Sequence, residues 1–444
     1  MITTSGWLDS YTPLLHQVQM MKKESLTRRN QNFEPCEDGR FFVTPTLETV
    51  DLSGVRVIDC SVDTVRQLYN GMLDHDLLDN LEERLEAEHR PVIEYQGHLW
   101  RLKRGGKAGF KFLLQNAEFG VIIMVKNNHT TADCVGSHCK IEVSPKLIRD
   151  RSPDVLQHQM DELAAGWFVI APSPCGVAIH LATDWQGWVP PSDFVDRLTC
   201  RSQRVNDRNG FQSLEVTTGE VASIYGRGQS YTFGTVSSLQ AALYNKSREI
   251  VAHDKIDYFH GIWSAKVDHD LTTPLWQPDQ DVWRLEFRFS QTVLRQFADY
   301  NTTEEKKCNL STYEAASEYL ANLWAYGLDR FRLDLNRRYV DPFWTLLNED
   351  TDWIKPASDF IPKRKYKTAG VGNERNVALA LGNLLSIYAR NNITARKAWS
   401  CLKKSGLWRD LMGYIKAREL TKADLFDLIE RGLLERRLTS KVAA

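Results

Sequence analysis

The chain has 444 residues, of which 42% are hydrophobic and 25% are charged, and its formal net charge at pH 7 is −1. This length exceeds one ordinary core, so we expect two or three domains of a soluble globular protein. No apolar run reaches the length of a membrane span, and the N-terminus lacks the features of a signal peptide. The eight cysteines are scattered rather than spaced as a disulfide framework. These features argue against membrane and secreted classes and predict a cytoplasmic protein.

The small net charge hides an asymmetry along the chain. Residues 363–444 hold 18 Lys/Arg against 7 Asp/Glu, so the remaining residues carry a net charge of −12. A compact basic segment predicts a polyanionic partner, with nucleic acid the first choice. The alternative is a solvated helical surface that is rich in Lys and Arg. The predicted DNA contacts of this segment are the cluster Lys363, Arg364, Lys365 and Lys367.

Hydrophobic spacing predicts the elements of the first 300 residues. Residues 1–60 are predicted to be an N-terminal arm, and the helical spacing of apolar residues in Val65–Glu88 predicts a helix. We expect helices also at Pro153–Phe168, Ser192–Arg201 and Gln291–Tyr300. Strands are predicted at Val92–Leu102, Phe110–Leu114, Phe119–Val125, Lys140–Val143, Gly176–Thr183, Leu239–Tyr244 and Val282–Phe289.

The remainder of the chain has a helical pattern. The expected helices are Thr312–Leu328, Pro342–Leu347, Glu374–Arg390, Thr394–Lys404, Trp408–Arg418 and Thr421–Arg437, with Pro356–Lys367 as a linker. The predicted fold class is therefore α+β: a mostly antiparallel β-sheet domain with flanking helices, followed by an all-helical C-terminal domain. The predicted boundaries are 61–300 for the sheet domain, 301–362 for a helical extension and 363–444 for the basic helical region.

One strand carries a candidate nucleophile. In Leu239–Tyr244 the alternation of side chains places Tyr244 on the face opposite Leu239, and an extended continuation would put Lys246 on the same face as Tyr244. A phenol beside a cation is a possible nucleophile, because the ammonium favours the phenolate or neutralises a phosphate under attack. The alternative is that Tyr244 is simply a strand aromatic.

Two other predicted strands present groups that bind metals. His180 and Asp184 share one face of their strand, and Arg284, Glu286 and Arg288 share one face of theirs. Carboxylates and an imidazole on neighbouring strands could hold a divalent cation, and Mg²⁺ or Mn²⁺ suits oxygen-rich ligands. The alternative is a set of cross-strand ion pairs on a solvated face.

These segments resemble the motifs of a known family. Phe233-Gly234-Thr235 followed by Tyr244-Asn245-Lys246 and Glu249 is similar to the "F-G-S…Y-[D/E/N]-K…E" motif of the Rep-trans replication initiators, which include rolling-circle plasmid initiators, filamentous-phage initiators and relaxases of conjugative elements. Arg284-Leu285-Glu286-Phe287 resembles the family's "R-x-E-[I/F]" strand. Gly176–Trp188 resembles its "R-x-D-L-A-x-D" strand, so the resemblance covers about residues 90–300.

The resemblance implies a site-specific enzyme that nicks and rejoins one DNA strand and starts rolling-circle replication. It assigns Tyr244 as the nucleophile, which stays joined to the 5′-phosphate, and Asp184 and Glu286 as metal ligands. His180 stands where the family has its first Asp, and Ala178 stands where it has Arg, which leaves the ligand set and the metal open. Tyr225, Tyr231 and Tyr258 remain possible second nucleophiles. The predicted DNA contacts of this domain are Arg227, Arg248, Arg284 and Arg288.

The expected partners are DNA that is single-stranded at the nick, a host helicase and a second copy of the chain in a homodimer, with no membrane. Three alternatives stay open: a relaxase that starts transfer of an integrative element, a DNA-binding regulator that keeps the fold without nicking, and a structural protein that binds DNA through its C-terminal helices. His129, Cys134, His138 and Cys139 fall close together and form a weaker candidate Zn²⁺ set, because the C-x₂-C spacing of zinc sites is missing.

Overall fold

The computed structural model of the protein divides the chain into two compact units, Met1–Lys365 and Tyr366–Ala444, called here the sheet unit and the helical unit. The residues that the structure describes are 40–43, 49–105, 109–126, 136–200, 205–207, 230–267, 274–305, 307–336, 339–353, 360–365, 374–417 and 420–437.

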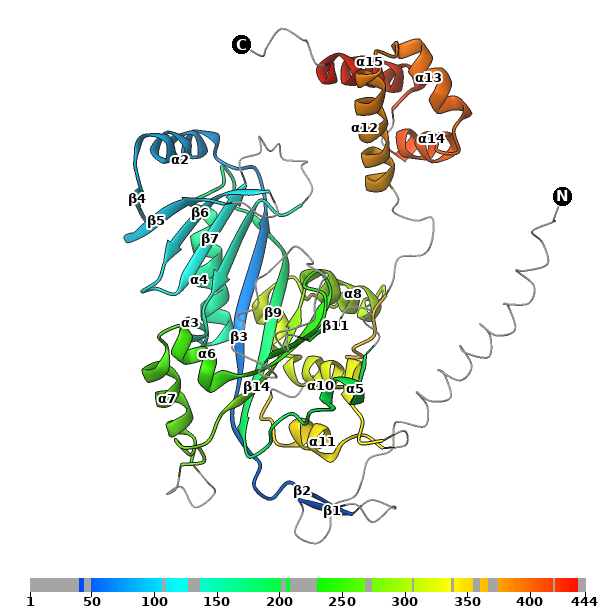
Figure 1. Ribbon diagram of the computed structural model, residues 1–444. Coiled ribbons are helices and arrows are strands. Elements are labelled where there is room, and N and C mark those ends of the chain that lie inside the picture. Colours follow the sequence, from blue (N-terminus) through cyan, green and yellow to red (C-terminus); the bar gives the residue numbers. More distant parts are fainter. Residues whose placement is uncertain are drawn as a thin grey trace, which may run out of the picture. The chain divides into compact units, whose positions relative to one another are not determined.

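The sheet unit is organised around one eleven-stranded sheet within the described residues, and all its neighbouring strands pair antiparallel (Figure 1). The strand order is β11-β12-β13-β14-β9-β3-β8-β7-β6-β5-β4. The strands are β3 (Arg56–Asn70), β4 (Val92–Tyr95), β5 (His98–Arg104), β6 (Phe110–Asn116), β7 (Val121–Lys126), β8 (Cys139–Val143), β9 (Ser173–Gln186), β11 (Val205–Asp207), β12 (Ser230–Gly234), β13 (Leu239–Asn245) and β14 (Trp283–Phe289).

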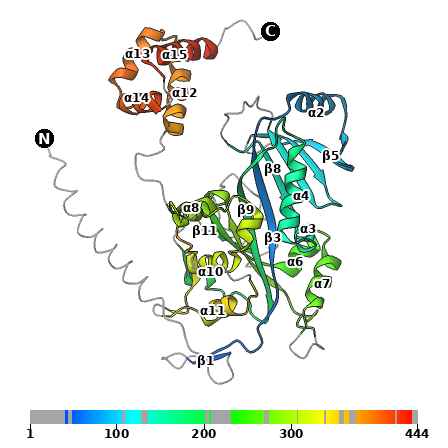
Figure 2. The same ribbon diagram turned by 180° about the vertical axis from the view of Figure 1, so that it is seen from behind.

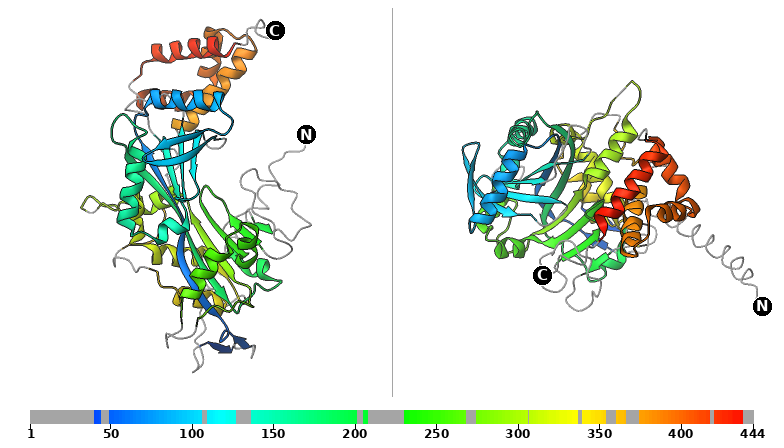
Figure 3. Two further views of the ribbon diagram at one scale, coloured as in Figure 1. Left: turned by 90° about the vertical axis from the view of Figure 1, so that its left-hand side faces the viewer. Right: turned by 90° about the horizontal axis from the view of Figure 1, so that it is seen from above.

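One face of this sheet packs against helices and forms the main core. Phe287 of β14 lies with its ring centroid 4.9 Å from that of Trp324 on α10 (Leu320–Arg330), and Met160 of α4 (Pro153–Ala165) is fully buried. Figure 2 shows α4, α8 (Gln291–Asn301) and α10 on this side. The opposite side carries α6 (Lys246–Ala252) and α7 (Ile256–Ala265), as the side view in Figure 3 shows.

The remaining elements of the sheet unit are short. Two-stranded sheets join β1 (Phe41–Val43) to β2 (Thr49–Asp51) and β10 (Leu198–Cys200) to β15 (Phe331–Leu333). The other helices are α2 (His75–Ala87), α3 (Pro145–Arg149), α5 (Phe194–Arg197), α9 (Tyr313–Ser317) and α11 (Pro342–Glu349). Among the described helices, none combines the length and the apolar character that crossing a bilayer requires.

The predicted helix at Val65–Glu88 is wrong in its first part. The chain is a strand as far as Asn70, and a helix forms only over α2. Val65, Gln67 and Tyr69 are all fully buried, and the half-exposed Arg66 lies between two of them. Because β3 has a hydrogen-bonded neighbour on each side, β8 and β9, period-two burial rather than helical periodicity decides its conformation.

Three other predictions need correction. The single strand expected at Val92–Leu102 is the hairpin of β4 and β5, turning at Gln96 and Gly97, which both have positive φ. The helix expected at Thr312–Leu328 is divided into α9 and α10, and Ser192–Arg201 holds only the short α5 before β10. The other predicted strands and helices are confirmed within a few residues at their ends.

The helical unit has a core of its own. Its helices are α12 (Glu374–Arg390), α13 (Ala395–Lys404), α14 (Trp408–Ala417) and α15 (Lys422–Arg436), which agree with the predicted segments. Leu385, Leu402, Leu411 and Ile429, one from each helix, are buried together. A capping box opens α15, since the Thr421 side chain accepts from the backbone of Asp424 and that carboxylate accepts from the Thr421 backbone. The fold class is therefore α+β, with an all-helical C-terminal part.

Candidate metal and tyrosine site

Three neighbouring strands bring the predicted residues together in rows. Tyr244 on β13 lies opposite Arg284 on β14, which lies opposite Asp184 on β9. Further along the same strands, Arg288 lies opposite His180. These side chains share the sheet face that is opposite the main core, which we call the site face.

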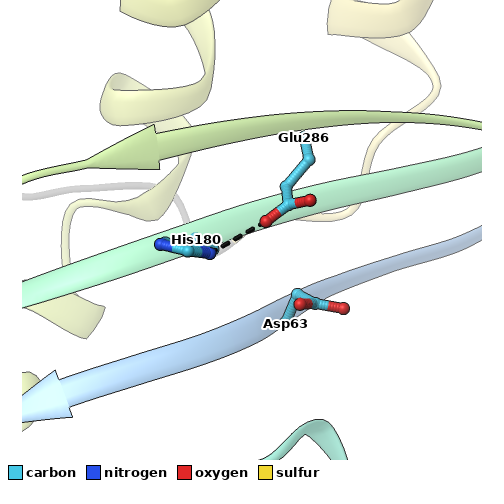
Figure 4. A group of neighbouring side chains, drawn as sticks. All are labelled: Asp63, His180 and Glu286. Atoms are coloured by element: carbon cyan, nitrogen blue, oxygen red, sulfur yellow. Dashed lines mark ion pairs between the residues drawn. The ribbon is translucent and has the colours of Figure 1, made fainter. Parts of the chain in front are cut away.

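Asp63, His180 and Glu286 form the one group of potential metal ligands among the residues that the structure describes (Figure 4). They come from β3, β9 and β14, and one ligand atom of each lies within 4.8 Å of those of the other two. The donor set of two carboxylates and one imidazole fits Mn²⁺ or Mg²⁺, and the imidazole also suits softer transition metals. The residues present therefore fit a divalent cation.

Glu286 is held as a carboxylate by its neighbours. It is 2% exposed, its Oε1 lies 2.8 Å from His180 Nδ1, and both its oxygens accept from Arg288 at 3.0 Å. Burial alone would raise the pKa of Glu286, but Arg288 and His180 outweigh burial and hold this pKa well below its ordinary value. Arg66 Nη1 lies 3.4 Å from His180 Nε2. A ring proton on Nδ1 satisfies both contacts of the imidazole, because Nδ1 then donates to Glu286 and Nε2 accepts from Arg66.

Asp184 stands outside this cluster, although the sequence predicts it to be a metal ligand. It is fully buried, and its two oxygens accept from Arg284 Nε at 2.5 Å and Nη2 at 2.8 Å. Trp263 Nε1–H donates to the same carboxylate at 2.8 Å. With its oxygens engaged by three donors, Asp184 serves as an anchor for Arg284, and Asp63 takes the place that we expected it to fill.

Arg284 links the anchor to the cluster. Its Nη1 donates to Asp63 Oδ1 at 2.5 Å, so one guanidinium bridges Asp184 and Asp63. Burial alone would lower the pKa of Arg284, but Asp184 and other neighbours outweigh it and raise this pKa well above its usual value. Arg284 is 1% exposed. A residue so buried and so fully engaged has no surface to offer to DNA, which overturns its predicted role as a DNA contact.

Tyr244 borders the cluster through its hydroxyl group. The phenolic O–H donates to Glu286 Oε2 over 3.4 Å, a long hydrogen bond, and the side chain is half-buried. Burial and the Glu286 carboxylate raise the pKa of Tyr244 well above its ordinary value, although Arg284 opposes them. The phenol is therefore protonated at neutral pH in the free protein, and a bound cation or a bound phosphate must assist its ionisation.

Lys246 lies near Tyr244, but on a helix and not on the extended strand that we predicted. The strand ends at Asn245, whose side chain caps α6, and Lys246 is the first residue of that helix. Its Nζ lies 5.7 Å from the centre of the Tyr244 ring and 2.5 Å from Glu249. Burial, followed by the repulsion of Arg284, lowers the pKa of Lys246. The proximity of Lys246 to Tyr244 thus agrees with the prediction, and the extended backbone between them does not.

The other candidate tyrosines differ in their placement. Tyr231 is 5% exposed in the main core, with its ring centroid 5.2 Å from that of Phe194. Tyr258 on α7 is half-buried, and its hydroxyl oxygen is buried without a hydrogen-bond partner. Tyr225 lies outside the described residues, as does the predicted DNA contact Arg227.

The candidate Zn²⁺ set is not assembled within the described part of the chain. His138 and Cys139 are buried, and Gly71 donates its backbone N–H to His138 Nδ1 at 3.4 Å. Burial raises the pKa of the Cys139 thiol, which disfavours the thiolate that zinc needs. His129 and Cys134 lie outside the described residues.

The remaining predicted DNA contacts lie in varied surroundings. Arg248 on α6 is exposed, and Arg288 donates to Gln240 as well as to Glu286. Lys363 lies 5.1 Å from the centre of the Tyr300 ring, Arg364 Nε donates to Gln296 at 2.7 Å, and the Lys365 backbone N–H donates to the Gln296 backbone. This part of the basic cluster therefore packs along α8 in the sheet unit. Lys367 lies outside the described residues.

Asp63 is the candidate ligand that sequence reasoning missed. It lies on β3 just before the segment that we predicted to be helical, at a β-bulge between Val62 and Thr64. The β-branched residues around it, such as Val57, Val62 and Thr64, are the signal that favours a strand. A bulge is common beside functional sites because it re-aims a side chain, and its position cannot be seen in a single sequence.

Comparison with known proteins gives one informative match. No family model matches the sequence, and no match is found among solved structures. The chain is 35% identical over 439 residues to "Uncharacterized protein ORF430" of Pseudomonas phage Pf1, in an alignment that covers 96% of this chain and 98% of that protein. The protein therefore belongs to the same family as ORF430 of Pseudomonas phage Pf1.

Proposed function

We propose that the protein cuts and rejoins one strand of DNA at a specific site, with Tyr244 as the nucleophile and a divalent cation as the cofactor, and that it thereby starts rolling-circle replication. The observation that carries the proposal is the 3.4 Å contact between the Tyr244 hydroxyl and Glu286, which is itself a member of the three-residue cluster. A nucleophile and a potential metal site thus meet at one carboxylate. The Rep-trans resemblance of the same segments supports this reading independently of the geometry.

Each residue of the site has a role in this reaction. Asp63, His180 and Glu286 would hold the cation, which supplies Lewis-acid polarisation of the phosphodiester when bound. Glu286 Oε2 accepts from the Tyr244 hydroxyl and so fixes the direction from which its oxygen approaches the phosphorus. The ammonium of Lys246 is buried, 5.7 Å from the centre of the Tyr244 ring, and its positive charge favours ionisation of the phenol during the attack.

The proposed covalent step keeps the energy of the broken bond. The Tyr244 oxygen loses its proton and bonds to phosphorus, while the bond from phosphorus to the 3′ oxygen breaks. The 3′ oxygen takes up a proton and becomes a free hydroxyl group, and the 5′-phosphate remains on the tyrosine. Because one phosphodiester replaces another, the same residues can reseal the strand without ATP.

The match to a phage protein favours the initiator over the relaxase alternative. The similar protein comes from Pseudomonas phage Pf1 and spans almost the same length as this chain. A phage protein of this kind is expected to act on phage DNA rather than in the transfer of a conjugative element. Start of phage DNA replication is therefore the role that we propose for the nicking reaction.

The test is covalent capture of DNA on Tyr244. Single-stranded oligonucleotides that tile the DNA carrying this gene are incubated with the protein and Mn²⁺, and the adduct is isolated by denaturing electrophoresis. We expect peptide mapping to find the nucleotide on Tyr244. Tyr244→Phe removes one oxygen atom and should eliminate the adduct while the variant still binds the same oligonucleotide.

Matched variants complete the experiment. Tyr258→Phe should leave the adduct intact, as should Tyr231→Phe, which changes a core tyrosine. A nucleotide mapped to Tyr225, Tyr231 or Tyr258 would show that another tyrosine is the nucleophile. Oligonucleotides that are bound but never cut, with Tyr244→Phe binding equally well, would instead favour a DNA-binding regulator.

A further inference from the structure

The site face continues beyond the cluster onto the strands β8, β7, β6 and β5. Arg66 on β3, which contacts His180, lies opposite Glu142 of β8 and forms an ion pair with it at 2.7 Å. Glu142 lies opposite Ile122 of β7, which in turn lies opposite Gln115 of β6. Paired positions thus run from the cluster to the far strands of the sheet on one continuous face.

The side chains on this part of the face are basic or apolar, with one amide and one acid. The alternating positions are half-exposed or exposed, whereas the residues between them, such as Leu114 and Ile123, are fully buried in the main core. We call this surface the basic face. Its members are Arg66, Arg101, Lys103, Leu113, Gln115, Ile122, Met124, Lys126, Lys140 and Glu142.

Several cations of the basic face are fixed in place by their neighbours. The Nζ atoms of Lys126 and Lys140 lie 5.5 Å and 5.3 Å from the centre of the Phe110 ring, which is itself only 7% exposed. Lys103 donates to Gln115 at 2.9 Å. Because contacts like these restrict the lysine side chains, less conformational entropy is lost when a phosphate binds.

We propose that the basic face is the track along which single-stranded DNA runs to Tyr244. This inference rests on the proposed function and names its substrate path. Charge is the first argument, since the face carries five cations against the single carboxylate of Glu142. Continuity is the second argument, because the strand pairing leads from Lys103 on β5 across the sheet to the cluster. Figure 1 shows β5, β6 and β7 with α4 behind them, on the side away from this face.

The apolar members select a single strand over a duplex. Leu113, Ile122 and Met124 are half-exposed between the cations. Unpaired bases offer apolar faces to such side chains while their phosphates meet the lysines, whereas a duplex turns mainly its phosphates outward. From β5 to β13 there are seven strand spacings of about 4.8 Å, or about 34 Å in all. This span corresponds to at most roughly ten nucleotides at the duplex spacing of about 3.4 Å per strand, and to fewer when the strand is extended.

The test measures binding of oligo(dT) by the full-length protein in EDTA, where no strand is cut. Fluorescent probes of 5 and 20 nucleotides are compared by anisotropy. We expect the 20-mer to bind at least about tenfold more tightly, because only the longer strand reaches β5. Arg101→Glu together with Lys103→Glu should remove most of that gain and leave the 5-mer unchanged. The salt slope should fall by up to about 0.7 for each phosphate that the variant no longer neutralises.

Matched controls separate the track from a general effect of charge. Lys146→Glu with Lys307→Glu changes the net charge equally at exposed positions outside the basic face and should alter neither probe. The milder Arg101→Gln with Lys103→Gln guards against misfolding and should show the same effect at smaller size. All variants are also measured on the Tyr244→Phe background, so the measured affinities for oligo(dT) do not depend on whether Tyr244 nicks DNA.

Three results would overturn the proposal. The first is equal binding of the 20-mer by the basic-face variant and by its control. The second is an equal loss of duplex and single-strand affinity, which would make the surface a duplex contact. The third is a change of oligomeric state in the basic-face variant with unaltered affinity for DNA, which would make the face an interface between copies of the chain.

Discussion

At the site of the sheet unit, charged side chains are paired in the protein interior, whereas on α13 of the helical unit they are exposed to solvent. Arg284 and Asp184 are paired at 1% and 0% side-chain exposure. The sequence of α13, ARKAWSCLKK, has no acidic residue, and its four cations are all exposed. At 100° per residue these cations fall within an arc of about 120°, opposite the buried Ala398 and Leu402.

The comparison separates two uses of charge. Buried, paired charges are costly to remove and hold groups in fixed positions, so they suit the positioning of a metal ligand and a nucleophile. Exposed charges of one sign act over a Debye length and suit attraction of a polyanion. The buried charges of the site and the exposed charges of α13 should therefore respond in opposite ways to the same kind of substitution.

The largest expected effect is on stability, from Arg284→Met. This change leaves Asp184 and Asp63 without their cation, and a buried carboxylate without its partner costs about 3–5 kcal/mol. In urea, the free energy of unfolding of the sheet unit should fall by that amount, while the urea midpoint of the helical unit stays unchanged. Arg248→Met, at an exposed position of α6, is the control and should change neither. A sheet unit of unaltered stability would show that the bridge contributes little.

Next in size is the loss of strand cleavage in Glu286→Gln. The amide keeps the shape of the side chain but removes a charged ligand, so adduct formation should slow by about 10³-fold, or roughly 4 kcal/mol. Glu286→Ala is a poorer test, because Glu286 is buried and the truncation strands Arg288 and His180. The rate is measured by adduct formation against Mn²⁺ concentration. Full activity in EDTA would contradict the metal assignment.

Acid unfolding should distinguish the units through the same carboxylate. The pKa of Glu286 in the folded protein is held well below the ordinary value of 4.5. Its contribution to stability is therefore complete above pH 4.5 and is lost as the pH falls further, through the folded pKa. Glu286→Gln should flatten the decline in stability of the sheet unit below pH 4.5, as followed by circular dichroism. An identical acid profile in the variant and the unaltered protein would show that Glu286 is not held in this way.

A smaller effect is expected from the exposed cations of α13. Replacing Arg396, Lys397, Lys403 and Lys404 by Gln should leave stability almost unchanged and weaken duplex DNA binding by about 10–100-fold. The slope of log affinity against log salt should fall by up to about 0.9 for each phosphate that is no longer neutralised. The matched set is Lys363, Arg364, Lys365 and Lys367, the cluster favoured by the sequence, of which the first three pack along α8. A larger loss in that second set would assign duplex binding to the predicted linker, Pro356–Lys367, instead of to α13.

The smallest effect concerns the cap of α15. Thr421→Ala removes one half of the capping box and should cost about 1 kcal/mol. Because the helical unit has its own core, the loss should appear in its unfolding transition alone. Thr302→Ala is the control. It changes an exposed threonine that follows α8 in the sheet unit, so any loss of stability should appear in the unfolding transition of the sheet unit and not in that of the helical unit. A single merged transition that shifts in both variants would show that the two units unfold together.

The sequence predicts the site better on some strands than on others. Tyr244, His180 and Glu286 fall on segments with clear alternation, so period-two spacing places each of them on the polar face of its own strand. The identity of the neighbouring strand does not follow from any local pattern, because β3 pairs with β9 across more than a hundred residues. The bulge that aims Asp63 into the cluster is also beyond local reasoning.

The exchange of Asp184 for Asp63 has the same origin. A carboxylate on the correct face looks equally suited to a metal or to an arginine until its cross-strand partner is known. Asp184 forms an ion pair because Arg284 lies directly opposite on β14. Trp263 of α7 also donates a hydrogen bond to its carboxylate. The helical unit was more accessible to prediction, because its helices follow one another in the chain and carry local signals such as the capping box.

The Asp184–Arg284 pair also constrains how this family can diverge. Changing either member alone leaves a stranded charge in a dry interior, and replacing both with apolar side chains still leaves Asp63 without the guanidinium of Arg284. Evolution by single steps must therefore cross an unfavourable intermediate. We expect the two positions to change together among descendants of a common ancestor or to stay fixed together, so that related sequences will show them as a covarying pair.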